Sequence, residues 1–207
     1  MLISRRRHFI FIHIHKNAGT SITDALKPFA ANKWEKLAYL ISRKLNVAQK
    51  FDSQIYAPHI SASKLVDMIG KEVFDSFFSF AIVRNPWDRQ VSLYKFILNE
   101  VSHFQHKLVK NLGSFEEFIK WQCAEKVPFQ KDFIYSSDGE LLVDFVGRFE
   151  KLEEDFAKIC SHIGVSTSLP KLNVSNAESY RHFYNEECRD LVRRKFDPDI
   201  TLFGYDF

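Results

Sequence analysis

Two apolar runs, each followed by a polar loop and then by a helical pattern, organise this chain. The first run lies in the stretch 8–26 (HFIFIHIHKNAGTSITDAL), where it is interrupted by His13, and it is long enough for a strand but too short to span a membrane. The second run, residues 77–83, reads FFSFAIV and is equally typical of a buried strand. This order of strand, loop and helix predicts an α/β domain.

The helical patterns behind the two runs begin and end at recognisable residues. The first is expected to end near Pro28. The second has Asn85 as an N-cap, Pro86 at the first helical position and Asp88 in the first turn, and it reaches about Ser102.

The rest of the chain adds mostly helices. The capping-box pair of Ser114 and Glu117 begins one helix, and Gly164 is expected to end another. Asp138-Gly139 is a hairpin-type turn signal that divides an apolar region, and the aromatic tail 203–207 is expected to pack on the core. The predicted helices are 33–45, 61–69, 114–125, 152–163 and 178–196; the strand is 54–57; the divided apolar region is 133–149.

Composition and length support one globular domain. The 207 residues are 45% hydrophobic and include 21 Phe, which is sufficient for a large aromatic core. We therefore expect a single domain over residues 1–207, with a central, mainly parallel sheet flanked by helices in a three-layer, P-loop-like fold. The net charge of +3 suits an anionic ligand but is too small for a typical nucleic-acid-binding surface.

The cysteines and the basic N-terminal residues bear on location. Cys123, Cys160 and Cys188 are odd in number and widely spaced, so they indicate neither a disulfide framework nor a zinc site. Arg5-Arg6-Arg7 precede an apolar run, yet no cleavage signature follows, and no transmembrane anchor is expected. The prediction is a cytoplasmic protein, with peripheral contact to the inner membrane face through the three arginines as its extension.

The loop behind the first strand has the composition of an anion-binding site. Small residues allow a close approach of the backbone, hydroxyls add donors, and the following helix contributes its unpaired N–H groups and its positive dipole end. The residues are Lys16, Asn17, Ala18, Gly19, Thr20 and Ser21. The lysine precedes the glycine, so this is not a Walker A loop. The alternative is a tight strand-to-helix turn in which Lys16 is merely solvated.

Three further residues follow strands or lie near them. Arg84 comes directly after the second strand, and Ser92 lies about two turns into the next helix, so the two can bind a second phosphate. The alternative for Arg84 is an ion pair with Asp88. His59 lies in a predicted strand-to-helix loop, where it can act as a general base or simply cap and pack.

These two loops are where the chain resembles a known family. HIHKNAGTS, residues 13–21, resembles the 5′-phosphosulfate loop of sulfotransferases that use 3′-phosphoadenosine 5′-phosphosulfate (PAPS). VRNPWDRQVSLY, residues 83–94, is similar to the 3′-phosphate motif of the same family, and the carbohydrate branch, with heparan-sulfate 2-O-type enzymes and their bacterial relatives, is the most similar. The chain departs from that family's pattern at His15, where proline is usual, and at Asn17, where threonine is frequent.

The resemblance implies a role for each candidate residue. The loop residues from Lys16 to Ser21 would hold the 5′-phosphosulfate, with Lys16 neutralising the departing bridging oxygen. Arg84 and Ser92 would hold the 3′-phosphate, and His59 would take the proton from an acceptor hydroxyl. The acceptor implied by the branch is a polysaccharide or glycolipid hydroxyl.

The chemistry is consistent with these roles, and other classes of protein predict different properties. Sulfuryl transfer is an in-line displacement that depends on positioning and electrostatics, so we expect no metal requirement. A kinase or NTPase would need Mg²⁺, and a non-catalytic nucleotide-binding protein would tolerate loss of His59. A metal-dependent hydrolase could use the two imidazoles of His13-x-His15, although two ligands are too few for such a site.

Overall fold

The computed structural model describes residues 1–30, 59–170 and 180–207, and contacts divide the chain into two compact units. The first unit consists of Met1–Val83 with Asp132–Leu172, and the second of Arg84–Lys131 with Asn173–Phe207. The predicted helix 33–45 and the predicted strand 54–57 lie outside the described residues.

The first unit is built on a sheet of four described strands in the order β1-β2-β3-β4. β2 pairs with β3 and β3 with β4 in parallel, whereas β1 is antiparallel to β2. All four residues of β2 are buried, as expected for an inner strand covered on both faces. The strands are β1 (Leu2–Ser4), β2 (Phe9–Ile12), β3 (Phe78–Val83) and β4 (Phe145–Arg148).

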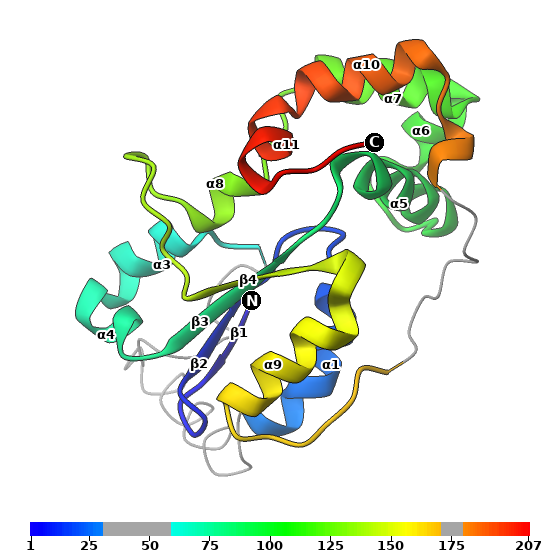
Figure 1. Cartoon of the computed structure of the whole chain (residues 1–207). Coiled ribbons are helices and arrows are strands. Elements are labelled where there is room, and N and C mark those ends of the chain that lie inside the picture. The colour runs from blue at the N-terminus through cyan, green and yellow to red at the C-terminus, as the bar shows by residue number, and fades with distance from the viewer. Residues whose placement is uncertain (31–58, 171–179) are drawn as a thin grey trace, which may run out of the picture. The chain divides into compact units, whose positions relative to one another are not determined.

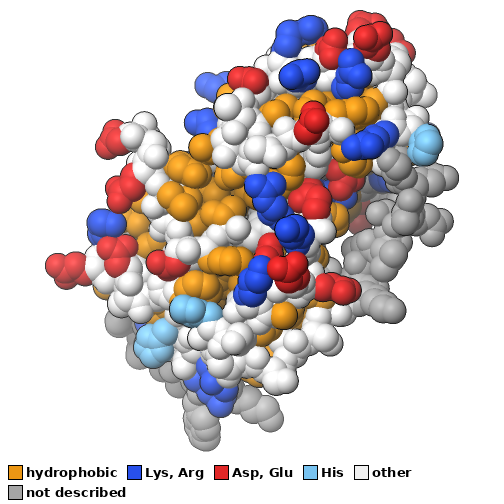
Figure 2. Space-filling view, in the orientation of Figure 1, with side chains coloured by type: hydrophobic (Ala, Val, Ile, Leu, Met, Phe, Trp, Pro, Cys, Tyr) orange, Lys and Arg blue, Asp and Glu red, His pale blue; other side chains and the backbone are white. Residues whose placement is uncertain are grey.

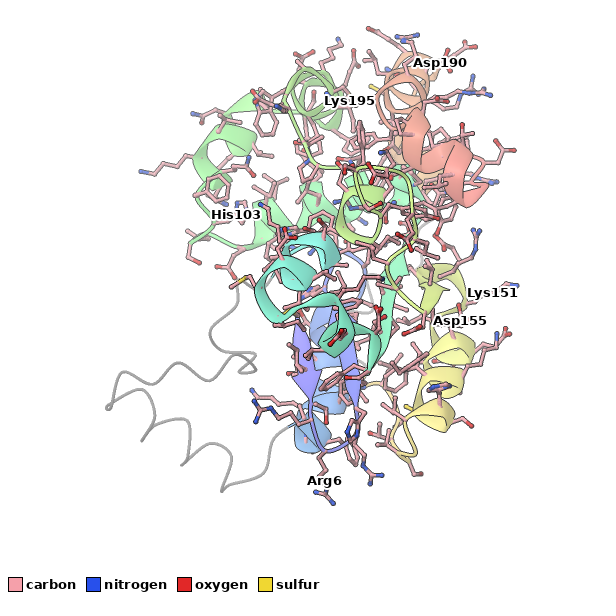
Figure 3. All side chains as sticks on the ribbon, turned by 90° about the vertical axis from the view of Figure 1, so that its left-hand side faces the viewer. Arg6, His103, Lys151, Asp155, Asp190 and Lys195 are labelled. Atoms are coloured by element: carbon pink, nitrogen blue, oxygen red, sulfur yellow. The ribbon has the colours of Figure 1, made fainter. Side chains whose placement is uncertain are left out.

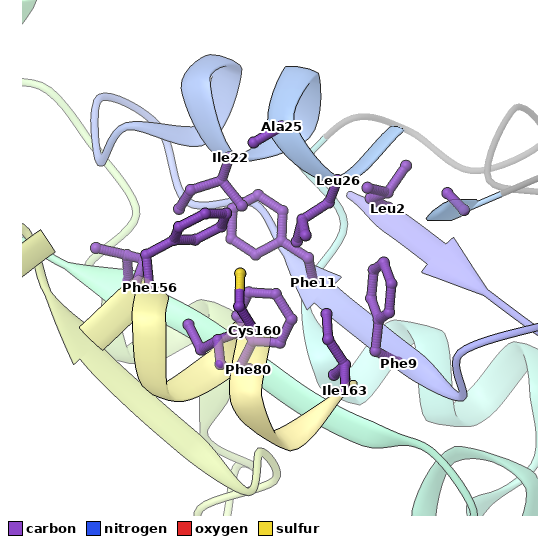
Figure 4. Packing of buried hydrophobic residues seen from close by; sticks show 13 residues of the cluster. Leu2, Phe9, Phe11, Ile22, Ala25, Leu26, Phe80, Phe156, Cys160 and Ile163 are labelled. Carbon is purple, nitrogen blue, oxygen red and sulfur yellow. The ribbon is translucent and has the colours of Figure 1, made fainter. Parts of the chain in front are cut away.

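Helices cover both faces of this sheet, which confirms the predicted α/β class with a central, mainly parallel sheet. In Figure 1, α1 (Gly19–Ala30) and α9 (Leu152–His162) lie on one side, and α3 (Ala62–Ile69) and α4 (Lys71–Asp75) lie on the other. Alternate strand residues such as Phe9, Phe11 and Phe80 pack against α1 and α9 in a shared apolar core (Figure 4). This packing anchors the start of α1 behind the carboxyl end of β2.

The second unit is helical in its described part. Its core contains Trp87, Phe118 and Phe196, and the ring of Phe207 packs edge-on against Trp87 at 5.6 Å, which confirms the predicted docking of the aromatic tail. The helices are α5 (Pro86–Asn99), α6 (His106–Leu112), α7 (Phe115–Ala124), the 3₁₀ turn η2 (Tyr180–Phe183), α10 (Glu186–Lys195) and α11 (Asp197–Phe203). Two further short elements in the described residues are α8 (Lys131–Ile134) and η1 (Phe149–Lys151).

Several predicted helix ends are confirmed by their caps. The side chains of Ser61, Asn85 and Ser114 each accept a hydrogen bond from a backbone N–H in the first turn of the helix that follows. Gly164 follows α9 with φ 64°, a conformation that glycine adopts without a Cβ penalty. α5 ends at Asn99, three residues before the expected Ser102, and α1 continues through Pro28 to Ala30.

The predicted last helix, 178–196, is divided. The 3₁₀ turn η2 ends at Phe183, and α10 begins only after Asn185, whose side chain accepts from the N–H of Cys188 and so caps a new helix. A separate helix, α11, then starts at Asp197, because Pro198 in its first turn has no N–H with which to extend α10.

The hairpin predicted around Asp138-Gly139 is reduced to one isolated bridge between Tyr135 and Leu141. The segment before the turn contains the short helix α8, and the segment after it forms β4, which pairs with β3. The Asp144 carboxylate accepts hydrogen bonds from the N–H and the hydroxyl of Ser79, so the chain is held beside β3 just before β4 begins.

The strand β1 was not anticipated from the sequence. Its three residues are too few for a periodic signal, and the arginines that follow it were interpreted only as a basic cluster that could contact a membrane. They form the turn between β1 and β2, with His8 at φ 49°, and the Arg6 side chain points away from the ribbon (Figure 3).

Candidate functional site

The predicted anion loop connects β2 to α1 in the first unit. Lys16 has φ 66° and Ala18 has φ 59°, so two non-glycine residues adopt left-handed conformations on either side of Asn17. Such conformations cost free energy in side chains other than glycine, and they concentrate at functional sites. A solvated connection between a strand and a helix would not need them. The loop is therefore a specific structure, held by the groups around it.

Asn17 holds this loop to the sheet. Its side-chain amide donates a hydrogen bond of 2.7 Å to the carbonyl oxygen of Ile82 in β3, and the residue is only 1% exposed. The amide side chain is thus directed into the protein, where it anchors the loop at the carboxyl ends of β2 and β3. Ligands bind beyond this edge in open α/β sheets.

Gly19 is the first residue of α1, and it lies directly against the His13 imidazole. A Cβ built on Gly19 would overlap the ring atoms of His13, so another residue here would displace the ring or the helix. Thr20, which is exposed, and Ser21, which is half-buried, place their hydroxyls in the first turn, where the backbone N–H groups have no partner within the helix.

His59 lies in a turn two residues before Ser61, the N-cap of α3. Its Nδ1 is 2.9 Å from the carbonyl oxygen of His13. A carbonyl oxygen only accepts hydrogen bonds, so Nδ1 must carry the proton and Nε2 has the lone pair. Burial lowers the pKa of His59, and the hydrogen bond to His13 only partly opposes this effect. Burial therefore favours the neutral form of His59, in which Nε2 carries the lone pair.

Three histidine rings meet at this point. The centroids of His15 and His59 are 3.3 Å apart with planes inclined by 24°, and those of His13 and His59 are 4.4 Å apart. Burial, and to a smaller extent the charges of the N-terminus, His59, His15 and Lys16, together lower the pKa of His13 to about 3. The sequence named these histidines separately, as one base and one ligand pair, and did not predict that they form one cluster.

The described residues contain no group of three or more His, Cys, Asp or Glu side chains that could hold a metal ion.

A cavity of about 530 Å³ lies at the opposite edge of the sheet, where β3 and β4 begin, and its lining includes Phe78, Phe145 and His162. It is therefore separate from the loop and from His59.

The second predicted site belongs to the second unit. Arg84 follows β3 directly in the chain, and its Nε is 2.8 Å from the Asp88 carboxylate, so the ion pair considered as an alternative is present. The side chain of Arg84 is only 7% exposed. Ser92 lies half-buried on α5. The structure thus gives Arg84 a fixed guanidinium and Ser92 a partly accessible hydroxyl.

A buried polar network around Arg84 was not predicted. The side-chain amide of Gln130 hydrogen-bonds to both main-chain groups of Arg84, and Asp199 accepts hydrogen bonds from the N–H groups of Gln130 and Lys131. Arg89 is buried, which lowers its pKa, while the charge of Asp199 acts in the opposite direction. The only signal in the sequence was the presence of polar residues among apolar ones.

The surface in view carries mixed charges. Basic and acidic side chains are interspersed over α10 in Figure 2, which agrees with the small net charge. In the described part of the chain, no helix has the length and apolar character needed to cross a membrane.

Comparisons with known proteins give a consistent family. The model of the sulfotransferase family matches residues 1–206. Human carbohydrate sulfotransferase 10 is 19% identical over 216 residues, with 84% of this chain and 61% of that protein covered. An uncharacterized protein of Archaeoglobus fulgidus is 34% identical over 116 residues, which cover 55% of this chain and 90% of that protein.

The similarity extends to solved structures, at low sequence identity and a low TM-score. A crystal structure of a sulfotransferase from Alicyclobacillus acidocaldarius aligns over 100% of this chain and 95% of its own, with 16% identity and a TM-score of 0.32. The carbohydrate sulfotransferase 10 of Pongo abelii is 22% identical over 168 residues, covering 63% of this chain and 47% of that protein. The chain therefore spans about half to three fifths of the length of these two animal relatives.

Proposed function

The chain belongs to the sulfotransferase family, and from this premise we propose that it transfers a sulfuryl group from PAPS to a hydroxyl of a carbohydrate, either a polysaccharide or a glycolipid. The observation that carries the proposal is the hydrogen bond of 2.9 Å between His59 Nδ1 and the carbonyl oxygen of His13. It assigns the ring proton to Nδ1 and leaves Nε2 as a base in the same unit as the anion loop.

In the proposed reaction, His59 Nε2 accepts the proton of the acceptor hydroxyl while the hydroxyl oxygen attacks sulfur. The bond between sulfur and the bridging oxygen breaks, and 3′-phosphoadenosine 5′-phosphate leaves with the added negative charge. The Lys16 ammonium and the N–H groups at the start of α1 stabilise that charge. In this scheme His59 takes up the proton, and Lys16 and the start of α1 face the charge of the leaving group.

The loop offers a cradle that fits a phosphosulfate group. Gly19 allows no Cβ beside His13, and the left-handed residues Lys16 and Ala18 turn the backbone tightly around Asn17. We assign the phosphosulfate to this loop, including Thr20 and Ser21. The 3′-phosphate is assigned to Arg84 and Ser92, because a buried guanidinium held by Asp88 is preorganised for charge-assisted hydrogen bonds.

The carbohydrate acceptor is supported by the names of two relatives, which are carbohydrate sulfotransferases at 19% and 22% identity. We further propose that the protein is cytoplasmic and that Arg5, Arg6 and Arg7 allow peripheral contact with the inner face of the membrane. Fractionation of cells that make the tagged protein tests the location. Secretion of the protein, or its recovery as an integral membrane protein, would contradict the proposal.

The first experiment is calorimetric titration with 3′-phosphoadenosine 5′-phosphate and, separately, with ADP in the absence of Mg²⁺. We expect the wild type to prefer the 3′-phosphorylated nucleotide and Arg84→Ala to lose that preference. Arg194→Ala, an exposed arginine of α10, is the matched control and should bind like the wild type. Equal affinity for both nucleotides, or binding that needs Mg²⁺, would instead favour a nucleotide-dependent kinase or NTPase.

The second experiment measures transfer from radiolabelled PAPS to a panel of unsulfated polysaccharides and glycolipids. We expect His59→Ala to abolish transfer and His162→Ala to retain it, since His162 of α9 stacks on Phe78 of β3, at the edge of the sheet opposite the histidine cluster. A His59→Ala variant as active as the wild type would exclude His59 as the base. Nucleotide binding without transfer to any acceptor would point to a non-catalytic binding protein.

A further inference from the structure

His59 is held on two different sides. Along its edge, Nδ1 donates to the carbonyl oxygen of His13 at 2.9 Å. Against its face, the His15 ring lies nearly parallel at a centroid distance of 3.3 Å. The hydrogen bond fixes Nδ1 only while the N–H stays in line with the carbonyl, and a ring held at that one atom alone can tilt out of line and lose the bond. The stack restrains the plane of the ring, and with it the direction in which the Nε2 lone pair points.

We propose that His15 is a positioning residue for the reaction, which holds the His59 imidazole by ring stacking so that Nε2 faces the acceptor hydroxyl. The proposal rests on the proposed function for what the base does, whereas the restraint on the ring rests on the contacts alone. His15 then contributes to the site in addition to His59 and to the phosphosulfate loop that begins at Lys16.

The chain order explains why one short segment can supply both restraints. His13 and His15 follow β2 at alternating positions, with the buried Ile14 between them holding the segment in place. The carbonyl of the first and the ring of the second therefore both reach His59, which arrives from the turn before α3. His15 itself is exposed and meets the buried Phe133 only edge-on, with ring centroids 6.2 Å apart, so its closest ring contact is the one with His59.

Positioning matters for a base because proton transfer needs a defined geometry between the lone pair and the hydroxyl. A misplacement of about 1 Å can cost on the order of a hundredfold in rate. Substrate binding would be affected much less, because the nucleotide contacts assigned above do not include His15. The effect of its loss should thus appear in kcat rather than in the KM for PAPS.

The test compares His15→Ala, which removes the ring, with His15→Phe, which keeps a ring that can stack but cannot titrate. His162→Ala is the matched control, because it removes a histidine that stacks on Phe78 at 3.8 Å elsewhere in the same unit. Two quantities are measured on each folded protein: steady-state kcat and KM for PAPS, and the side-chain ¹⁵N spectrum of His59, which reports its tautomer.

We expect His15→Ala to lower kcat by about tenfold to a hundredfold with KM for PAPS within about twofold, and to replace the single Nδ1–H tautomer of His59 by a mixture. His15→Phe should restore both quantities, and His162→Ala should change neither. The proposal is overturned if His15→Ala keeps wild-type kcat, or if kcat falls while the His59 tautomer is unchanged.

Failure of the proposed function would look different. If the wild type transferred nothing from PAPS, or if His59→Ala were fully active, the reaction assigned to His59 would be wrong. The ¹⁵N spectra would then decide alone whether His15 holds the ring: loss of the single tautomer in His15→Ala and its return in His15→Phe support the restraint, and an unchanged spectrum overturns it.

Discussion

The side-chain amide of Gln130 pairs with the main chain of Arg84 as a neighbouring strand would. Its Oε1 accepts from the Arg84 N–H at 2.9 Å, and its Nε2 donates to the Arg84 carbonyl oxygen at 2.9 Å. Both residues are buried, so neither main-chain group of Arg84 can turn to water instead. One side chain therefore fixes the backbone of the residue to which we assign the 3′-phosphate.

Replacing Gln130 by alanine should destabilise the protein by about 2–4 kcal/mol, because two buried main-chain groups lose their partner at once. The free energy of unfolding in urea measures this change. Gln105→Ala is the control, since the Gln105 side chain does not cap α6, and its effect should stay within about 0.5 kcal/mol. A Gln130→Ala variant as stable as the control would mean that the amide pair is energetically unimportant.

The contact between Gly19 and His13 predicts a clash that can be relieved. Gly19→Ala places a Cβ in the His13 ring and should cost about 1–3 kcal/mol through displacement of the ring or of the α1 start. Since the loop carries the proposed phosphosulfate site, binding of 3′-phosphoadenosine 5′-phosphate should weaken as well. Urea unfolding and calorimetry measure the two effects.

The double variant His13→Ala/Gly19→Ala is the matched control for this clash. With the imidazole removed, the added methyl has space, so the two substitutions should be less destabilising together than the sum of their separate effects, by about 1 kcal/mol or more. Strict additivity would show that the glycine is needed for another reason than the close approach of the ring.

Much of the architecture could be predicted from the sequence because strong local signals coincide with it. The apolar runs that form β2 and β3 are long and nearly continuous, and Asn85, Ser114 and Gly164 define helix ends through interactions within a few residues. For the same reason, the sequence places the two loops to which we assign ligands directly after β2 and β3, where the structure has them.

What was missed depends on contacts between residues distant in the sequence. β1 is three residues long and is a strand only because β2 lies beside it. The cluster of His13, His15 and His59 forms because the turn before α3 brings the last ring back over the first two, and no spacing rule encodes a return over 44 residues or more. Tertiary pairing overrides local propensity in each case.

Acidification should destabilise the protein through His13. Burial holds the pKa of the folded imidazole at about 3, below the usual 6.5, so the unfolded chain takes up a proton that the folded chain refuses. The stability associated with a neutral His13 is therefore complete above about pH 6.5 and is lost progressively as the pH falls towards 3. Urea unfolding of the wild type and of His13→Gln at a series of pH values measures it.

His13→Gln has no titrating group at this position, while all carboxylates are kept. The difference in the free energy of unfolding, wild type minus variant, should therefore decrease steadily below about pH 6.5. A difference that stays constant from pH 7 to pH 4 would show that the imidazole is as easily protonated in the folded protein as in the unfolded chain.

Ser92 offers a test of the 3′-phosphate assignment that leaves the buried network of Arg84 intact. The residue is half-buried on α5, so removing its hydroxyl should leave the fold unchanged. If it donates to the 3′-phosphate, Ser92→Ala loses one hydrogen bond to a charged group, and affinity for 3′-phosphoadenosine 5′-phosphate should fall by about tenfold. Affinity for ADP, which lacks that phosphate, should be unaffected, because the lost contact has no counterpart there. Ser102→Ala serves as the control, since the Ser102 hydroxyl hydrogen-bonds only to the exposed Glu100 in the described structure. Calorimetry that shows equal losses of affinity for both nucleotides in Ser92→Ala would remove Ser92 from the 3′-phosphate site.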